Sequence, residues 1–311
     1  MRLVTYTAGP QGTPRSGVRV GHRVLDIEGA SRVKGEPLPS TMRGLLQAGR
    51  GALSRVQALA KAAQSDTRPY TAVLYEERAV RFLPPVPDPD KFLCVGKNYR
   101  AHLEELKKHD LIKEMPEEVT GFVKLTSSLV GHDARVVKPE LVQRLDYEPE
   151  LVFVIGKRAL GVKADDEDAL DFAVGVTLLN DLTDRDMQKR EVASGSRFWT
   201  SKNAPGFGPL GPEIVTMDEI GDPYDLWIVC TVNGEERMRV NTGDQIWKFP
   251  QILEHFSRTM PLEPGDMFST GAPGGVAVGR PNAEELYLKA GDVVECSIDG
   301  ITTLRTTIVA P

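Results

Sequence analysis

The amino-acid sequence predicts a mainly β protein with helices, an α+β fold. Short runs that alternate apolar and polar residues recur along the chain, as they do in half-buried strands. Asn233-Gly234 and Asp299-Gly300 each separate two such runs, which is a strong signal for a β-hairpin. Because only a few helical segments interrupt these hairpins, the order of elements favours a mainly antiparallel sheet over a doubly wound α/β sheet.

The first part of the chain is predicted to form a small domain. Residues 1–30 alternate as strands around a turn at Gly21-His22, and residues 41–64 carry apolar side chains at helical spacing. Four prolines follow between residues 84 and 89, and neither a helix nor a central strand accommodates them. We therefore place a domain boundary in this stiff connector. A small β-rich domain with a helix is expected at residues 1–85 and a catalytic domain at residues 86–311.

The second part of the chain is rich in strands. Strands are expected at residues 92–95, 147–156 and 172–179, and hairpins at residues 226–240 and 293–309. Two helices are expected between them, one over residues 181–191 and one over residues 245–259 with a proline inside it.

Composition narrows the class of protein. With 311 residues, 41% of them hydrophobic, the chain can bury a large core. A net charge of −6 argues against a nucleic-acid-binding protein, which usually carries a basic surplus. The chain has no apolar run of the about 20 residues that cross a membrane, and its start lacks the apolar core of a signal peptide. Its three scattered cysteines form no CxxC pair, so a cytoplasmic location without disulfides is expected.

Two carboxylates stand at the head of an apolar strand. Glu148 and Glu150 are two residues apart, so in a strand both side chains point to the same face. The apolar run over residues 151–155 indicates core surroundings, in which two like charges need a cation between them. A hard divalent cation suits carboxylate oxygens, whereas the plainer interpretation is an exposed strand end with two solvated glutamates. This segment alone leaves both interpretations open.

A third carboxylate follows the strand at residues 172–179. Asp181, Arg185 and Gln188 are spaced i, i+4 and i+7, which puts them on one face of the expected helix. If the strand brings Asp181 beside the glutamate pair, three carboxylates complete an oxygen cage for a metal ion. The alternative is an amphipathic helix with a solvated face and an acidic residue at its N-terminus.

Three further segments carry groups that suit catalysis or binding. Lys202 lies in a Gly/Pro-rich loop and could contact an anion, although most lysines are plain surface residues. His102 and Glu105 are neighbours on the helix expected after residue 96, so the carboxylate can orient the imidazole as a general base. An ordinary helix surface also explains such a pair. Backbone amides of the turn-rich loop at residues 269–276 could cradle a carboxylate.

Taken together, these segments resemble the fumarylacetoacetate hydrolase superfamily over roughly residues 90–310. The resemblance implies a mixed β-sandwich roll with a small N-terminal domain, commonly as a homodimer. Its carriers are Gly-Lys-Asn-Tyr-Arg-Ala-His-Leu-Glu-Glu from residue 96, Asp-Tyr-Glu-Pro-Glu-Leu from 146, Asn-Asp-Leu-Thr-Asp-Arg-Asp-Met-Gln from 180, Trp-Thr-Ser-Lys from 199, Gly-Pro-Leu-Gly-Pro from 208 and Thr-Gly-Ala-Pro-Gly-Gly-Val from 270.

The same motifs imply the residues of a site. A carboxylate triad that binds a divalent metal falls on Glu148, Glu150 and Asp181, with Mg²⁺ expected and Mn²⁺ or Ca²⁺ as alternatives. The family's lysine near the metal falls on Lys202, and its His–Glu pair, on a segment that closes over the site, falls on His102 and Glu105. The residues expected to contact a small carboxylate substrate are Tyr99, Arg185, Gln188, Thr270 and Gly271.

Two departures from the family's pattern lie beside these residues. In many members the third residue after the site lysine is Asp, the fourth is Thr or Gly, and the fifth is Phe. In this chain the same three positions are Pro205, Gly206 and Phe207. The common Gly-Thr-Pro becomes Gly271-Ala272-Pro273, which removes a hydroxyl that could bond a substrate carboxylate. Neither change affects a predicted metal ligand, but both lie where a substrate is expected, so the motifs do not identify the substrate.

The predicted activity is metal-dependent hydrolysis of a carbon–carbon bond in a small 2,4-dioxo acid of the acylpyruvate type. His102, oriented by Glu105, is expected to activate the attacking water, and Lys202 to stabilise or protonate the departing enolate. The same site without water attack predicts a decarboxylase of oxaloacetate-like acids or an isomerase of a 2-hydroxy-dienoate. A non-catalytic module that binds carboxylates is the alternative from another class, and the number of converging ionisable groups argues against it.

Overall fold

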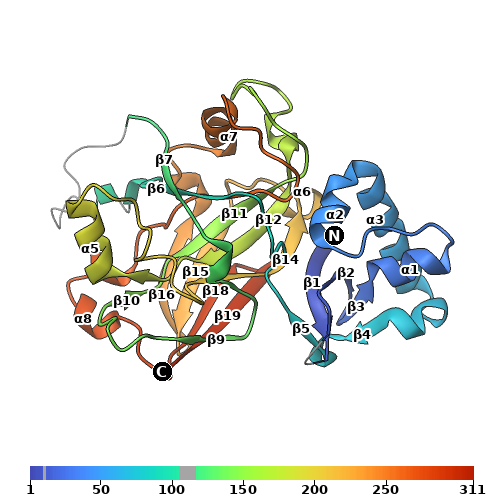
Figure 1. Cartoon of the computed structure of the whole chain (residues 1–311), viewed down its shortest axis with the longest axis horizontal. Helices are drawn as coiled ribbons and strands as arrows, with labels where there is room; N and C mark the ends of the chain where they lie inside the picture. The colour runs from blue at the N-terminus through green and yellow to red at the C-terminus, as the bar shows by residue number, and fades with distance from the viewer. Residues whose placement is uncertain (10–11, 102, 105–116) are drawn as a thin grey trace.

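The computed structural model describes residues 1–9, 12–101, 103–104 and 117–311 (Figure 1). Its strands are β1 (Arg2–Ala8), β2 (Arg15–Val20), β3 (Arg23–Asp26), β4 (Leu74–Glu76), β5 (Val80–Phe82), β6 (Phe92–Gly96), β7 (Thr120–Val123), β8 (Leu129–Val130), β9 (Ala134–Val137), β10 (Leu145–Asp146), β11 (Pro149–Ile155), β12 (Ala173–Asn180), β13 (Thr183–Asp184), β14 (Gly208–Thr216), β15 (Trp227–Val232), β16 (Glu235–Asn241), β17 (Met267–Ser269), β18 (Val293–Ile298) and β19 (Thr302–Val309).

Among the described residues, helices are fewer than strands. The α-helices of the described residues are α1 (Ile27–Val33), α2 (Met42–Gln47), α3 (Gly49–Ser65), α5 (Arg185–Ala193), α6 (Met217–Ile220), α7 (Phe249–Ser257) and α8 (Ala283–Leu286). Short 3₁₀ turns are η1 (Arg68–Val73), η2 (Glu77–Ala79), η3 (Thr126–Ser128), η4 (Ala169–Phe172), η5 (Thr242–Asp244) and η6 (Ala277–Gly279). None of the described helices combines the length and apolar character that a membrane span requires.

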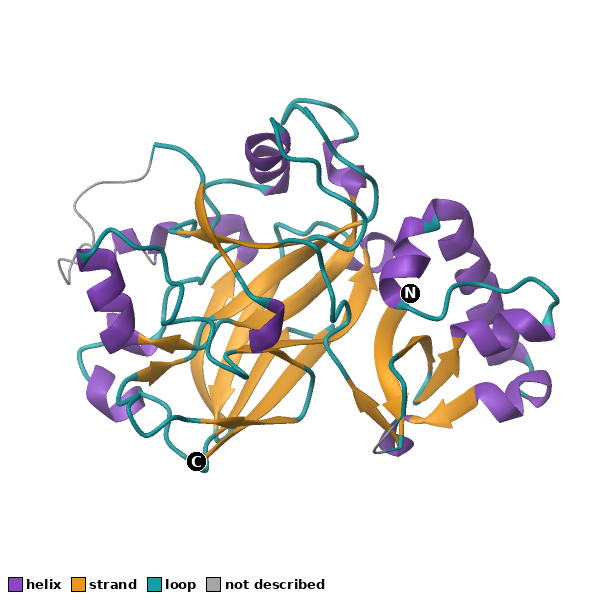
Figure 2. Ribbon diagram, viewed as in Figure 1, coloured by secondary structure: helices purple, strands orange, loops and turns teal. Residues whose placement is uncertain are grey.

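Two stacked sheets form the body of the molecule, and the predicted α+β class is confirmed. A 12-stranded sheet runs β4-β3-β2-β1-β14-β12-β11-β17-β6-β7, with β5 beside β1 and β8 beside β14. A 5-stranded sheet, β16-β15-β18-β19-β9, lies against its central strands, and β10 pairs with β13 (Figure 2). Most pairs are antiparallel, as expected from the hairpins; β8, β6 and β9 pair in parallel with β14, β17 and β19.

Strand β11 is buried on both faces, which explains its unbroken apolar run. Phe153 packs into the core between the two sheets, together with side chains of β15, β18 and β19. Val152 and Val154 point the other way, into a second core that contains side chains of α2 and α3. A strand covered on both faces has no solvent side to carry polar residues, so its sequence loses the period of two.

The two predicted hairpins are confirmed, whereas three predicted helices have different bounds. Residues 41–64 form two helices, because Gly49, the first residue of α3, adopts φ +75° and breaks the helix after α2. The helix expected at 181–191 begins only at Arg185, since the Asp184 carboxylate caps it by accepting from two backbone amides at 3.1 Å. The helix expected at 245–259 is α7, and its proline lies in the first turn, where a missing N–H costs no hydrogen bond.

The N-terminal strands continue the large sheet instead of forming a sheet of their own. Strand β1 pairs with β14, with Arg2 opposite Val215.

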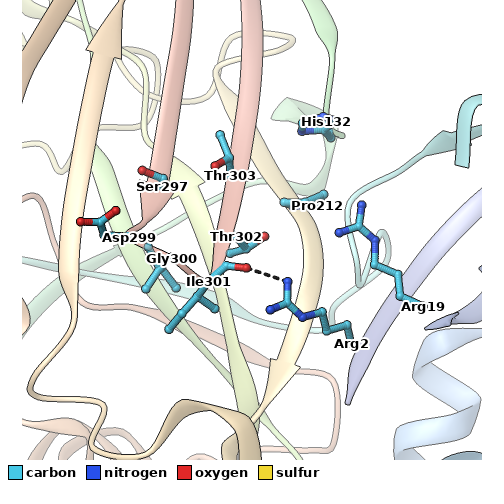
Figure 3. A pocket seen from close by; sticks show the side chains of 11 residues that line it. Arg2, Arg19, His132, Pro212, Ser297, Asp299, Gly300, Ile301, Thr302 and Thr303 are labelled. Atoms are coloured by element: carbon cyan, nitrogen blue, oxygen red, sulfur yellow. Dashed lines mark hydrogen bonds between the residues drawn. The ribbon is translucent and has the colours of Figure 1, made fainter. Parts of the chain in front are cut away.

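A cavity of about 390 Å³ lies at the junction of β1 and β14, and Figure 3 shows Arg2 and Arg19 reaching into it from the N-terminal strands. The Arg2 guanidinium donates to the Ile301 carbonyl at 2.6 Å and, like that of Arg19, is ion-paired with buried Glu213, at 3.0 and 2.8 Å. The division of the chain at residue 85 stays a prediction.

A buried ion pair organises the N-terminal strands. The Asp26 carboxylate accepts hydrogen bonds from Tyr6 Oη at 2.6 Å, from Arg15 Nε and Nη2 at 2.5 and 2.8 Å, and from the Gly29 amide at 2.6 Å. Burial alone raises the pKa of this carboxyl, but the Arg15, Tyr6 and Gly29 hydrogen bonds outweigh it and hold the pKa below its usual value. The ionised form is therefore the stabilising one.

We expect Asp26→Asn to lower the free energy of unfolding at pH 7 by about 2–4 kcal/mol, because Arg15 loses its buried partner. In the wild type this contribution is complete above the unfolded-state pKa of about 4 and is lost as the pH falls through the lower folded-state pKa. Urea unfolding between pH 7 and pH 3 measures both effects. Asp66→Asn, at a fully exposed ion pair with Arg68, is the control and should leave stability unchanged. Equal stability of Asp26→Asn and wild type would contradict the assignment.

Candidate functional site

Three carboxylates meet where β11 begins and β12 ends. The two strands pair antiparallel with Pro149 opposite Asn180, so Glu148 and Asp181 lie side by side and Glu150 follows on β11. Each of the three offers an oxygen, and these oxygens lie within 4.8 Å of one another. All three residues are buried, at 3%, 2% and 0% exposure for Glu148, Glu150 and Asp181. The structure thus assembles the predicted triad and excludes the solvated strand end.

Asp181 reaches this cluster from a loop and not from a helix. It follows β12 directly, and its backbone amide donates to the Glu148 carbonyl at 2.8 Å. The expectation that Asp181, Arg185 and Gln188 share one helical face is therefore wrong. Strand pairing, rather than helical spacing, places the third carboxylate.

Two buried lysines neutralise part of the cluster. Lys202 Nζ, as its motif implies, donates to Asp181 Oδ2 at 2.5 Å and also to Glu148 Oε2. Lys124 Nζ donates to Asp181 Oδ1 at 2.7 Å, to the Phe207 carbonyl at 2.8 Å and to the Lys202 carbonyl. Sequence reasoning missed Lys124, because it lies 57 residues from Asp181 and has no local motif.

Arg185 borders the cluster on another side. Its Nη2 lies 2.6 Å from Glu148 Oε1 and 2.7 Å from Asp146 Oδ2, and its Nη1 donates to Gln188 Oε1 at 2.9 Å. Asp146, also missed from the sequence, accepts hydrogen bonds from two backbone amides of η6, at 2.9 and 3.0 Å. Arg185 and Gln188 thus lie at the site, and their contact with a substrate stays a prediction.

The charges of the described residues suit a divalent cation. Counted in their ionised forms, four buried carboxylates face three buried cations, which leaves one negative charge in excess; the carboxylates are Asp146, Glu148, Glu150 and Asp181, and the cations Lys124, Arg185 and Lys202. Glu150 receives its hydrogen bond from the neutral Ser269 hydroxyl, and burial, then the Asp181 charge, raise its pKa. A cation among these oxygens would supply the missing charge, and oxygen-only ligands favour Mg²⁺, Mn²⁺ or Ca²⁺.

Three predicted substrate residues follow the neighbouring strands: Tyr99 comes after β6, and Thr270 and Gly271 come directly after β17. Tyr99 Oη lies 3.3 Å from Thr270 Oγ1 and accepts a hydrogen bond from Gln245 at 3.1 Å. Gly271 adopts φ +89°, and a Cβ at this position would lie 2.6 Å from the Val95 carbonyl. Because only glycine fits this close approach, the backbone after β17 stays next to β6.

The predicted His102–Glu105 pair lies outside the described residues, so its role stays a prediction. The described residues beside it begin the expected helix: the Leu103 amide donates to the Tyr99 carbonyl at 3.0 Å. The Ala101 amide donates to the Asp244 carboxylate at 3.0 Å. The second contact ties the start of this segment to η5.

We expect Lys124→Met to lower the free energy of unfolding by about 3–5 kcal/mol, because a buried carboxylate and two carbonyls lose their donor. Lys124 is 2% exposed, so water cannot replace the ammonium group. Denaturant unfolding measures the loss, and the exposed Lys61→Met is the control. A variant as stable as the wild type would show that Lys124 is not needed to neutralise Asp181.

Comparisons with known proteins agree with this geometry. A family model described as fumarylacetoacetate (FAA) hydrolase C-terminal matches residues 91–309. The oxaloacetate tautomerase fahd2, mitochondrial, of Xenopus laevis is 34% identical over 99% of this chain and 90% of its own length. A putative HpcE protein from Mycobacterium smegmatis superposes with a TM-score of 0.81 at 29% identity, covering 100% and 99% of the two chains. Maleylpyruvate hydrolase from Sphingobium sp. SYK-6, in complex with manganese (II) ion and pyruvate, superposes with a TM-score of 0.74 at 27% identity, covering 100% and 99%.

Proposed function

This chain belongs to the fumarylacetoacetate hydrolase family, and on that premise we propose that it is a tautomerase of a small 2-oxo dicarboxylate such as oxaloacetate. The observation that carries the proposal is the triad of Glu148, Glu150 and Asp181 in a chain similar over nearly its whole length to an oxaloacetate tautomerase. The predicted carbon–carbon hydrolysis has less support: the hydrolase with bound manganese is 27% identical. The isomerase or decarboxylase alternative is therefore the better interpretation.

The proposed reaction moves one proton and breaks no carbon–carbon bond. From keto to enol, a proton leaves C3, its electron pair forms the C2–C3 double bond, and a proton arrives on the C2 oxygen; from enol to keto the same steps run in reverse. A divalent cation held by Glu148, Glu150 and Asp181 would act as a Lewis acid on the 2-oxo acid group. Because water does not enter the products, the site needs only to stabilise charge and to move this proton.

Lys202 would stabilise the negative charge that develops on the C2 oxygen. Burial alone lowers the pKa of Lys202, but the Asp181, Glu148 and Glu150 carboxylates outweigh it and hold the pKa above its usual value. The side chain therefore stays an ammonium group, a donor and not a base. We assign the transfer of the C3 proton to His102, oriented by Glu105, the predicted pair that the resemblance places over the site.

Product analysis tests the proposal. With Mg²⁺ or Mn²⁺, the protein should accelerate the loss of ultraviolet absorbance of enol-oxaloacetate beyond a metal-only blank. Decarboxylation would release CO₂ and pyruvate, and hydrolysis of an acylpyruvate would release two acids; both are followed by mass spectrometry. Faster formation of two acids than of the keto form would overturn the proposal in favour of the hydrolase.

The assembly and the location of the protein remain proposals. We propose a homodimer and a cytoplasmic location, as the sequence predicts. The mitochondrial location in the name of the Xenopus laevis relative is a property of that protein. Size-exclusion chromatography with light scattering tests the first, and imaging of the tagged protein tests the second.

A further inference from the structure

Two cations, Lys97 and Arg197, have no acidic partner among the residues that the structure describes. Within the part of the chain that the structure describes, neither Lys97 nor Arg197 forms an ion pair or a side-chain hydrogen bond. Other basic groups at the site are each held by a carboxylate: Lys124 by Asp181, and Arg185 by Asp146. Two cations that lie near one another repel, and an anion bound between them would relieve this repulsion.

Sheet pairing places Lys97 at the same sheet end as the carboxylates. Strands β6 and β17 run parallel with Cys94 opposite Ser269, and β11 runs antiparallel to β17 with Val152 opposite Ser269. The residues after β6 and β17 therefore lie beside the start of β11, where Glu150 stands. Lys97 is the first residue after β6.

Arg197 reaches the same place from the segment that carries Lys202. The Phe198 ring packs edge-on against the Phe122 ring at 5.3 Å, and Phe122 lies opposite Cys94 in the β6–β7 pair. The Lys202 ammonium lies 5.3 Å from the centre of the Phe122 ring and 5.9 Å from that of Phe198. The chain next to Arg197 therefore lies close to the Lys202 ammonium group, which contacts Glu148 and Asp181.

The charges of the two side chains act on each other. Burial, and then repulsion by the Arg197 guanidinium, lower the pKa of Lys97. The backbone is left-handed at Lys97, with φ +58°, and at Phe198, the residue after Arg197, with φ +52°. This left-handed conformation is unfavourable for residues other than glycine, and it persists where the surrounding structure requires it.

We propose that Lys97 and Arg197 bind the distal carboxylate of the substrate and make the site specific for dicarboxylates. The proposal rests on the proposed tautomerase function and adds to it the residues that recognise the second acid group. The 2-oxo acid end would lie at the carboxylate triad, and the distal end would lie between the two cations. Guanidinium and ammonium groups suit a carboxylate because both its oxygens accept charge-assisted hydrogen bonds.

The test compares oxaloacetate with its C4 methyl ester, which keeps the 2-oxo acid and lacks the distal charge. In the wild type, KM for the diacid should be lower than KM for the ester. Lys97→Met and Arg197→Gln should each raise KM for the diacid about tenfold, or about 1.4 kcal/mol, with kcat and the KM for the ester unchanged. Lys97→Arg should retain the preference. Lys189→Met, at an exposed lysine of α5, is the matched control and should behave as the wild type.

Binding separates this proposal from the proposed function. If the wild type tautomerises neither compound, the tautomerase proposal fails. Calorimetry with 2-oxoglutarate and 2-oxopentanoate in the presence of Mn²⁺ then decides the specificity: the diacid should bind more tightly, and Lys97→Met should abolish that difference. Equal affinity of the two acids for the wild type, or a preference unchanged in both variants, would overturn the role of Lys97 and Arg197.

Discussion

Glu150→Gln is expected to abolish divalent-cation binding and to lower the turnover of oxaloacetate about 10³-fold, the upper range for loss of one electrostatic catalytic group. Glu150 differs from its two companions in the triad. Asp181 and Glu148 are paired with lysine or arginine, whereas Glu150 accepts from the Ser269 hydroxyl. A neutral amide at this position removes the charge for which a cation is needed, and it adds an N–H that repels the cation.

Manganese titration followed by electron paramagnetic resonance measures this loss without relying on activity. Glu213→Gln is the matched control, because Glu213 is also a fully buried glutamate but lies on β14, paired with Arg2 and Arg19. That variant should lose stability and keep wild-type manganese affinity. If Glu150→Gln bound manganese as tightly as the wild type, the triad would not be the metal site.

Lys202→Met is expected to lower kcat about 10²–10³-fold while metal binding is retained or tightened. Turnover and metal affinity are expected to change in opposite directions because Lys202 Nζ donates to both Glu148 and Asp181. Without the ammonium group the two carboxylates have more negative charge to offer a cation, but the substrate oxygen loses its donor. The apoprotein should lose stability, and manganese should restore more of it than in the wild type.

Steady-state kinetics, calorimetry and thermal melts with and without Mn²⁺ separate these effects. Lys202→Arg keeps the charge but should not restore kcat, because a planar guanidinium cannot replace a compact ammonium group between two carboxylates and two aromatic rings. A Lys202→Met variant with wild-type kcat would exclude Lys202 from charge stabilisation. Loss of metal binding together with kcat would make it a structural residue.

Local signals made part of the site predictable. Glu148 and Glu150 are two residues apart on a strand, so their common face follows from the period of the strand alone. The family motifs then pointed to Asp181 and Lys202, and the structure brings both to the glutamates. The helix expected at Asp181 was wrong because Asp184 caps the helix, and a cap three residues inside an acidic segment is hard to recognise in the sequence.

Contacts between distant segments were not predictable. Lys124 and Asp181 are 57 residues apart, and Asp146 and Arg185 are 39 apart. Nothing in the local sequence of a lysine or an aspartate tells whether it will be buried, because most such residues are exposed. Only packing decides which charges lose their water and therefore need a partner.

The mainly β fold, the two hairpins and the glutamate pair at the head of a buried strand all follow from local sequence. These depend on backbone preferences and side-chain periods that act over a few residues. The tertiary structure decided the rest: that β1 joins β14 in one sheet, that three buried cations leave one carboxylate charge uncompensated, and that Lys97 and Arg197 have no acidic partner among the described residues. Those features depend on pairing across most of the chain, where the balance between desolvation and charge is settled only once the sheets are packed.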